Sequence, residues 1–485
     1  MQQHTLVEIG AAIGAPVSGD VSLAALTHDT RFITPGTLWV AVPGLAHHGI
    51  EFIDAAVAAG VTAIASDGKG IARAHELGIP TIELADVRRD MGRLAAFFYG
   101  HPDRNLSICG ITGTNGKTTT AFMVRHILRS VGKSVGMIGT LGAWIDSEHV
   151  PGVRTTPEST DLFALLADMS SQGVTHVAME VSSHGLSLHR VEGMTFDVGV
   201  FTNLTQDHLD FHGSMEEYFA AKASLFSHTR SAVVNVDDSW GMKLASTIVD
   251  QQLITIGSVG QWVARDVESS LETLTSFTLH APEGEVHRVT LNMLGDFNVT
   301  NAVTALAVCS QFGIDIESSV HTMSTFSGVP GRFEDVSHQG PGRAFVDYAH
   351  TPDAVDKVLQ GIRGAHPETL ITVIGCGGDR DSSKRYDMGR VASELSDVVI
   401  VTDDNPRSED PHLIRAEVLR GAHDGSARVI EIGDRREAIR TALGMADTRD
   451  VVAVLGKGHE QGQEISDVVH AFDDREVIKQ ESAHA

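Results

Sequence analysis

Cysteine is scarce and scattered in this chain. Its three cysteines, Cys109, Cys309 and Cys376, are far apart and form no CxxC pair. This spacing argues against a disulfide framework and against a structural zinc site. No stretch approaches the roughly 18 uninterrupted apolar residues of a membrane-spanning helix, and the first residues lack the basic and then apolar pattern of a secretory signal. We therefore expect a soluble, cytoplasmic protein without membrane insertion.

Basic residues are also in short supply. Lysine and arginine number 37 against 63 aspartates and glutamates, which gives a formal net charge of −26. Nucleic acids and anionic lipids attract basic faces, so we expect neither as a general partner. An anionic substrate would have to be held by local arginines, lysines, backbone N–H groups and metal ions.

The length predicts about three domains, since 485 residues are divided at about 150 per domain. Short apolar runs alternate with helical patterns throughout, which predicts an α/β fold. We place the domain boundaries at 1–104, 105–331 and 332–485. The second boundary is a hinge rich in proline and glycine at 328–331.

The stretch with the clearest chemistry is 110–120, Gly-Ile-Thr-Gly-Thr-Asn-Gly-Lys-Thr-Thr-Thr, between a short apolar run and a helical pattern. A strand, a glycine-rich turn and a helix in this order can hold phosphate on backbone N–H groups, while Lys117 adds a charge and Thr118 can reach magnesium. A strict P-loop has glycine at position 111, where this chain has Ile111. The context still favours phosphate binding over a structural glycine turn.

Further polar residues follow strands of the same region. Glu180 ends a mostly apolar strand, where a magnesium ligand would sit if that strand is parallel to the phosphate-loop strand. The following Ser-Ser-His at 182–184 lacks the G-x-S-x-G elbow of a serine hydrolase. The loop 202–212 contains two histidines and two aspartates within six residues, which is equally consistent with a metal or phosphate neighbourhood and with a polar capping loop.

Two other features have ordinary explanations when taken alone. Lys222 lies on the third turn of a helix that begins with a Ser214–Glu217 capping box, and a lone helical lysine is typically a solvated charge. The polar residues 28–31 fit turn chemistry.

Residues 332–485 repeat a strand followed by a polar loop four times, with loops beginning at Asp347, Gly375, Asp403 and Gly456. In an open parallel sheet the carboxyl ends of the strands line the ligand crevice. This pattern predicts a second substrate-binding α/β domain. Residues 375–378 do not fit G-x-G-x-x-G, so a dinucleotide site is a poor match.

Taken together, these motifs resemble the Mur ligases, the ATP-dependent amide ligases of peptidoglycan precursor synthesis. The resemblance covers nearly the whole chain in the family's motif order, and it rests on 112–119, 180–184, 202–208, 330–334 and 347–350. It implies an N-terminal α/β domain that binds UDP, a central P-loop ATPase-like domain with a parallel sheet, and a C-terminal Rossmann-like α/β domain.

Within the family, Asp29-Thr30-Arg31 and Asp404-Asn405-Pro406-Arg407 resemble the ligases that add the third peptide residue. The Asp-Asn-Pro-Arg form is associated with meso-diaminopimelate rather than lysine. Diaminopimelate is lysine with one more carboxylate, which a planar guanidinium can bind through two hydrogen bonds. Arg407 would be this clamp. Lysine would leave it unpaired, at a cost of about two to four orders of magnitude in selectivity.

The resemblance also implies the reaction. ATP would activate the D-glutamate carboxylate of UDP-N-acetylmuramoyl-L-alanyl-D-glutamate as an acyl phosphate, and meso-diaminopimelate would displace the phosphate, with ADP released. The implied cofactors are ATP and Mg²⁺. We expect a monomer with small-molecule substrates, whose domains close across the hinge at 331.

The resemblance implies a role for four sets of residues. The ATP set is Gly113, Thr114, Asn115, Gly116, Lys117, Thr118, Thr119, Asn301, Arg332, Asp347 and His350. The UDP-muramoyl dipeptide set is Thr30, Thr155, Thr156, Ser182 and Arg190. The diaminopimelate set is Arg380, Asp404, Asn405, Arg407, Gly456 and Glu460. The catalytic set is Lys117, Glu180, His208 and Lys222, and the implied magnesium ligands are Thr118, Glu180, His208 and a carbamylated Lys222.

Two positions depart from the family pattern: Thr30 stands where serine is common, and Leu188 where some relatives have glutamine near the muramoyl substrate.

Three alternatives to this function remain. A sister ligase, such as a folylpolyglutamate synthase or the ligase of the fourth residue, would not explain Arg407. A P-loop switch or motor would hydrolyse nucleotide without ligating anything. A non-catalytic scaffold is disfavoured because the catalytic set is intact.

Overall fold

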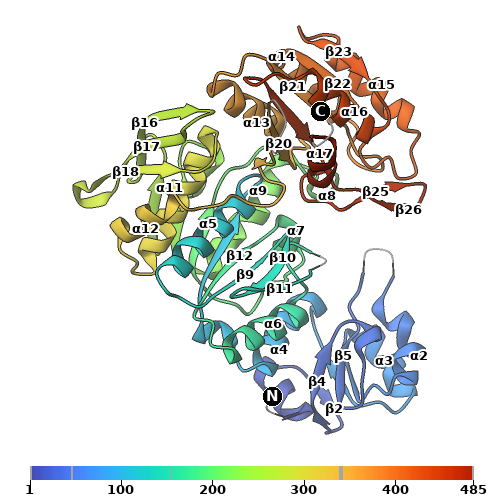
Figure 1. The fold of residues 1–485 in the computed structure, drawn as a ribbon. Coiled ribbons are helices and arrows are strands. Elements are labelled where there is room, and N and C mark those ends of the chain that lie inside the picture. Colours follow the sequence, from blue (N-terminus) through green and yellow to red (C-terminus); the bar gives the residue numbers. More distant parts are fainter. Residues whose placement is uncertain (1–2, 45–46, 153, 338–341, 483–485) are drawn as a thin grey trace.

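The computed structural model describes residues 3–44, 47–152, 154–337 and 342–482. Three sheets, built mainly from parallel strands, follow one another along the chain (Figure 1). In Figure 1 the N-terminal sheet, in blue, and the C-terminal sheet, in orange and red, lie at opposite ends of the molecule with the central sheet between them. This architecture has the predicted α/β class.

The N-terminal sheet has five strands in the order β2-β7-β6-β5-β4, of which β4 to β7 are parallel. Its strands are β2 (Val17–Ser18), β4 (Ala25–Thr27), β5 (Thr37–Val40), β6 (Ala63–Ser66) and β7 (Thr81–Glu83). A separate strand pair and the helices around the sheet are β1 (His4–Thr5), β3 (Ser22–Leu23), α1 (Leu6–Ile13), α2 (Ile53–Ala58), α3 (Gly68–Glu76) and α4 (Val87–Phe98). Thr5 and Glu8 form a reciprocal capping box that starts α1.

The central sheet has eight strands in the order β11-β10-β9-β12-β8-β13-β14-β15, and the six from β9 to β15 are parallel. These strands are β8 (Ser107–Thr112), β9 (Val135–Gly139), β10 (Gly142–Ile145), β11 (Glu148–Val150), β12 (His176–Glu180), β13 (Phe196–Phe201), β14 (Thr229–Asn235) and β15 (Gln252–Ile256). The phosphate-loop strand β8 thus lies between β12 and β13. Because these strands are parallel, the residues that follow them meet at one edge.

The helices of this region are α5 (Lys117–Ser130), α6 (Ser159–Ser171), α7 (Ser183–Ser187), α8 (Leu209–His212), α9 (Met215–Ala223), α10 (Ser239–Ala245), α11 (Asp296–Gln311) and α12 (Ile316–Met323). A small antiparallel sheet consists of β16 (Val263–Ser270), β17 (Leu274–His280) and β18 (Val286–Leu291). The alanine-rich α11 is almost entirely buried and packs against α5.

The C-terminal sheet has six strands in the order β19-β20-β24-β21-β22-β23, and all but β19 are parallel. They are β19 (Glu334–Asp335), β20 (Arg343–Asp347), β21 (Leu370–Ile374), β22 (Val398–Val401), β23 (Arg428–Glu431) and β24 (Val451–Leu455). The remaining elements are α13 (Pro352–Gly364), α14 (Lys384–Leu395), α15 (Pro411–Ala422), α16 (Arg435–Met445), α17 (Asp474–Ser482) and the hairpin of β25 (Gly462–Ile465) and β26 (Val468–Ala471). Four of the parallel strands end in the polar loops predicted from the sequence.

Hydrophobic clusters cross both predicted domain boundaries. Met91 and Leu94 of α4 belong to the same buried cluster as Phe163 of α6. At the second boundary, the ring of Phe333 lies 5.6 Å from that of Phe297 on α11 and 5.1 Å from that of Phe345 on β20. The boundaries at 104 and 331 therefore lie between segments that share buried packing.

None of the helices in the described ranges has the length and apolar sequence of a membrane span.

A buried ion pair fastens the last helix to the C-terminal sheet. The Arg435 guanidinium donates to both carboxylate oxygens of Asp474, at 2.8 and 2.7 Å, and to the carbonyl of Leu455 at 3.0 Å. Both side chains of the pair are fully buried.

We expect Asp474→Ala to lower the free energy of unfolding by about 3–5 kcal/mol, because it leaves a buried guanidinium without its counter-charge. Urea denaturation followed by fluorescence measures this change. The matched control is Glu394→Ala, which removes an exposed pair with Arg390 and should leave the unfolding midpoint nearly unchanged. Equal midpoints for the two variants would contradict the prediction.

Candidate active site

The phosphate loop connects β8 to the N-terminus of α5 and passes close to neighbouring segments. Gly113 has φ 147° and Gly116 has φ 85°, in the range that favours glycine. A Cβ atom on Gly113 would lie 1.9 Å from Thr202 Oγ1, and one on Gly116 would lie 2.5 Å from Asn301 Oδ1. Backbone conformation thus favours glycine at both positions, as does the close approach of Thr202, which follows β13, and of Asn301 on α11.

A partly buried lysine and a fully buried one donate to the same carbonyl of this loop. Lys117 Nζ donates to the carbonyls of Gly113 and Thr114, both at 2.9 Å, and Lys222 Nζ donates to the Gly113 carbonyl at 2.7 Å. Burial lowers the pKa of both lysines, and for Lys222, whose pKa falls well below its usual value, the charge of Lys117 adds to the effect. Lys222 is 1% exposed, so it is not the solvated charge that its helix alone suggested.

Glu180 lies fully buried at the end of β12 beside the phosphate loop. Its carboxylate accepts hydrogen bonds from the hydroxyls of Thr118 (3.0 Å) and Thr140 (3.1 Å) and from the Thr140 N–H (2.9 Å). Thr140 has no assigned role in the sequence analysis, although it directly follows β9, the neighbour of β12. A hydroxyl and a carboxylate in contact are donors of the kind that Mg²⁺ prefers.

The residues that the structure describes include no group of three or more histidine, cysteine, aspartate or glutamate side chains placed to hold a metal. A magnesium ion at Glu180 would thus need further oxygen ligands from nucleotide phosphates and water, as is usual for this ion.

His208 and its neighbours form a cluster of rings next to the loop. The His208 ring lies 4.9 Å from that of His184 and 6.2 Å from that of Tyr218, and its Nε2 is 3.3 Å from an oxygen of Asp207. Burial lowers the pKa of His208 to about 4. The neutral imidazole that results is the form that ligates metals.

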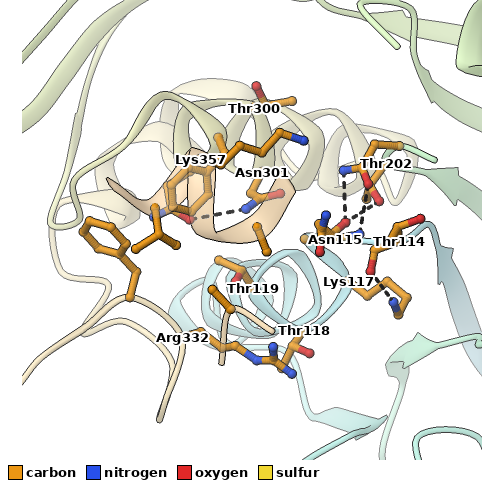
Figure 2. A pocket seen from close by; sticks show the side chains of 18 of the residues that line it. Thr114, Asn115, Lys117, Thr118, Thr119, Thr202, Thr300, Asn301, Arg332 and Lys357 are labelled. Carbon is orange, nitrogen blue, oxygen red and sulfur yellow. Dashed lines mark hydrogen bonds between the residues drawn. The ribbon is translucent and has the colours of Figure 1, made fainter. Parts of the chain in front are cut away.

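A cavity of about 890 Å³ opens between the central and C-terminal domains. In Figure 2, Lys117, Thr118 and Arg332 are drawn in the lower part of the view and Asn301 and Lys357 in the upper part. Within the ATP set, all residues but Gly113 line the cavity; Glu180, His208, Thr155 and Ser182 do so too. Asn115 Nδ2 donates to Asp353 of α13 at 3.0 Å, which joins the loop to the C-terminal domain.

The hinge region contributes charge to this cavity. The Arg332 guanidinium lies 4.5 Å from the centre of the Tyr348 ring. Asp347 accepts a hydrogen bond from the Phe333 N–H at 2.6 Å, and burial raises the pKa of Asp347 to about 6. Tyr348 is thus a further cavity residue without a role in the sequence analysis.

Four residues of the dipeptide set lie in one network beside Glu180. The Thr156 hydroxyl donates to the Glu180 carbonyl (3.1 Å) and accepts from the Ser182 N–H (3.0 Å), while Arg190 donates to the Thr156 carbonyl (3.0 Å). Thr155 joins it through Thr140, at 3.1 Å between their hydroxyls. The buried Glu158, which the sequence analysis missed, lies 2.8 Å from the Arg190 guanidinium.

Thr30 lies apart from this network, in the N-terminal domain. Asp29 accepts a hydrogen bond from the Arg31 N–H at 2.9 Å, which is the turn chemistry expected from the sequence. The neighbouring His28 ring is 2.7 Å from the Thr160 hydroxyl of α6, so this turn is attached to the central domain.

The diaminopimelate set lies outside the cavity lining, on loops that follow strands of the C-terminal sheet. Asn405 donates to Glu460 at 2.8 Å, and the fully buried Lys457 donates to both, at 2.9 and 3.2 Å. A Cβ atom on Gly456 would lie 2.6 Å from Asp404 Oδ2. Lys457 is absent from the predicted set although it lies between two of its members. Arg380 lies on the loop that follows β21.

From the sequence, we expect Arg407 to be unpaired when the bound amino acid is lysine, which has no second carboxylate. The structure differs, because Arg407 has partners within the chain itself. Its guanidinium donates to the Gly378 carbonyl at 2.7 Å and to Glu464 at 3.2 Å.

A phosphate loop beside a buried carboxylate, facing a second α/β domain with its own polar cluster, defines an α/β nucleotide-using enzyme with substrates on separate domains. Three family models match in succession: the Mur ligase family catalytic domain (22–99), the Mur ligase middle domain (111–309) and the Mur ligase glutamate ligase domain (331–458). The chain belongs to the Mur ligase family, and it is an ATP-dependent ligase.

Similar proteins agree with this result. The UDP-N-acetylmuramoyl-L-alanyl-D-glutamate–2,6-diaminopimelate ligase of Streptomyces coelicolor is 44% identical, over 98% of this chain and 96% of that protein. The ligase of the same name from Corynebacterium glutamicum is 44% identical, over 97% and 94%. A solved structure of a ligase with this name has TM-score 0.69 and 32% identity over 95% of both chains. MurF of Thermotoga maritima in complex with ADP has TM-score 0.65 at 20% identity, which shows the shared fold.

We expect Gly113→Ala to weaken ATP binding roughly tenfold or more, because a side chain there adds about 1–3 kcal/mol of strain and pushes the loop away from Thr202. Calorimetric titration with ATP measures the change. The control is Gly132→Ala, since Gly132 also has a positive φ (81°) but has open space around its Cβ position. Similar ATP affinities in both variants would contradict the prediction.

Proposed function

We propose that this protein is an ATP-dependent ligase that adds meso-diaminopimelate to UDP-N-acetylmuramoyl-L-alanyl-D-glutamate, in the cytoplasmic synthesis of peptidoglycan precursors. The observation that carries the proposal is the pairing of two sites: the phosphate loop beside Glu180, and the cluster of Asn405, Arg407 and Glu460 on the neighbouring domain. The similarity to ligases of this name over nearly the full chain supports the choice of substrates.

In the proposed reaction, the D-glutamate side-chain carboxylate attacks the γ-phosphorus of ATP, which gives an acyl phosphate and ADP. The free amine of diaminopimelate then attacks the acyl carbon, loses a proton, and the tetrahedral intermediate expels phosphate. No protein nucleophile is needed. The chain contributes by positioning the reactants and neutralising phosphate charge, with Lys117 and the loop N–H groups on the nucleotide.

The donors present fit the implied magnesium ions. Thr118 and Glu180 would hold one ion near the phosphates, and His208 with a carbamylated Lys222 would hold a second. When bound, these ions would neutralise the charge that develops on the transferred phosphoryl group.

The environment of Lys222 supports carbamylation. Burial lowers the pKa of this lysine well below its usual value, which favours the neutral amine, and only a neutral amine can attack carbon dioxide. The product is a carbamate anion and a released proton. Conversion to an anion would also remove the repulsion between Lys222 and Lys117.

The amine substrate has its own group of donors and acceptors. Asp404 and Glu460 are suited to an ammonium group, and Arg407 is suited to the carboxylate that distinguishes diaminopimelate from lysine. The four linked residues Thr155, Thr156, Ser182 and Arg190 would hold the muramoyl dipeptide, with Thr30 on the N-terminal domain. The contact between Asn115 and Asp353 at 3.0 Å is a point where the domains would tighten during closure.

We expect Lys222→Met to lower kcat roughly 10²–10³-fold, because it removes a charged group at the site of phosphoryl transfer. Steady-state ADP release measures kcat, and ¹³C NMR of the wild-type protein in ¹³C-bicarbonate should show a carbamate signal that the variant lacks. Lys243→Met is the control, since Lys243 lies at the surface of α10. Full activity in Lys222→Met would rule out this role.

The proposed function is tested by ADP release from the purified protein with ATP, magnesium and UDP-N-acetylmuramoyl-L-alanyl-D-glutamate. We expect turnover with meso-diaminopimelate and at least roughly tenfold lower kcat/KM with L-lysine, because lysine lacks the second carboxylate. Preferred turnover with lysine would keep the family but refute the proposed substrate. No turnover with either amino acid, while ATP still binds, would favour a sister ligase.

A further inference from the structure

The surroundings of Arg407 contain a carboxylate of the chain itself. Arg407 Nε donates to Glu464 Oε2 at 3.2 Å, and Arg407 Nη1 donates to the Gly378 carbonyl at 2.7 Å. Glu464 lies on β25, the first strand of the C-terminal hairpin, and its side chain is 38% exposed against 20% for Arg407. The ion pair therefore lies at the surface end of the proposed amino-acid site.

The backbone holds the two residues side by side. The Arg407 N–H donates to the Glu464 carbonyl at 3.0 Å, and the Ser466 N–H donates to the Arg407 carbonyl at 2.8 Å. Glu464 N–H in turn donates to Asn405 Oδ1 at 3.0 Å. Glu464 is therefore fixed to two residues of the diaminopimelate set by main-chain bonds that do not depend on its carboxylate.

The Arg407 guanidinium has further N–H groups that can bind a ligand. Of its five N–H groups, one on Nε and one on Nη1 have partners, and the other three have none among the residues that the structure describes. A substrate carboxylate that approaches these groups would share the guanidinium charge with Glu464. Two anions then compete for one cation, whereas lysine brings no second carboxylate and leaves the Glu464 pair intact.

We propose that Glu464 is a specificity-determining residue that acts through Arg407: its carboxylate competes with the second carboxylate of diaminopimelate and lowers the discrimination against lysine. The inference rests on the proposed function, since it takes diaminopimelate as the amine substrate. Glu464 is a positioning residue in this scheme. It keeps Arg407 paired and ordered when no diamino acid is bound, and it reduces the penalty that an unpaired arginine would impose on lysine.

The decisive variant is Glu464→Gln, which keeps the side-chain size and the main-chain bonds but removes the charge. We expect the KM for meso-diaminopimelate to fall roughly two- to fivefold, in line with the loss of one competing surface ion pair. The KM for L-lysine should stay the same or rise, and kcat with diaminopimelate should change little. Glu394→Gln, which removes the exposed pair with Arg390, is the control and should alter neither KM.

An opposite role for Glu464 gives an opposite result. If its carboxylate instead binds the ammonium group that both diamino acids carry, Glu464→Gln will raise both KM values. That outcome, or an unchanged KM for diaminopimelate, would overturn the inference.

A second measurement does not depend on activity. Phenylglyoxal modification of Arg407, followed by peptide mass spectrometry, should be faster in Glu464→Gln than in the parent protein, and meso-diaminopimelate should slow it in both. An unchanged modification rate would overturn the inference. If the parent releases no ADP with any amino acid, the proposed function fails, and the modification rate still decides whether Glu464 shields Arg407.

Discussion

The arrangement of the site depends on the hydrogen bonds that two lysines donate to the Gly113 carbonyl. This carbonyl accepts hydrogen bonds from the side-chain nitrogens of the partly buried Lys117 and the fully buried Lys222, which come from different helices. Burial lowers the pKa of both lysines, and the charge of Lys117 lowers that of Lys222 further, because two like charges are costly away from water. The loop is thus arranged for an anion, or for a change in the charge of one lysine, and both are part of the proposed chemistry.

Other residues of the site lie at the ends of strands parallel to the phosphate-loop strand β8. Glu180 at the end of β12 contacts Thr118 of α5 and also, through its own carbonyl, Thr156 of the dipeptide network. One residue therefore connects the nucleotide side with the side proposed for the acceptor carboxylate. The ends of the C-terminal strands supply the third group of polar residues, including Asn405 and Glu460. The common edge of a parallel sheet explains why polar loops distant in sequence meet.

The sequence predicts the parts of this arrangement that depend on local order. A strand, a glycine turn and a helix identify the phosphate loop, and an acidic residue at a strand end identifies Glu180. Lys222 shows what local sequence cannot predict. Its own helix indicates a solvated charge, but the side chain is buried because α9 packs against the phosphate loop. The two residues in contact, Lys222 and Gly113, are 109 positions apart. The role proposed for Lys222 comes from the family resemblance, and the structure adds its burial and its contact with Gly113.

Other site residues could not be predicted because their partners are distant in the chain. Thr140 is defined by its contact with Glu180, and Glu158 by its contact with Arg190. Lys457 is an ordinary lysine in sequence, but its ammonium is fully buried between Asn405 and Glu460. The pairing of Arg407 with Glu464 depends on the fold of a hairpin that begins only at Gly462, far from Arg407 in the chain.

The packing of Phe333 has a consequence for how the chain can be divided. Its ring stands between Phe297 of the central domain and Phe345 of the C-terminal domain, and residues of both domains belong to one buried cluster. A fragment cut at the hinge would expose aromatic surface on each half, which favours aggregation of either half. Exchange of the C-terminal domain with that of another ligase would therefore have to carry the matching aromatic residues of both sides. New amine specificity by domain shuffling is correspondingly harder to reach than by point substitutions in the loops.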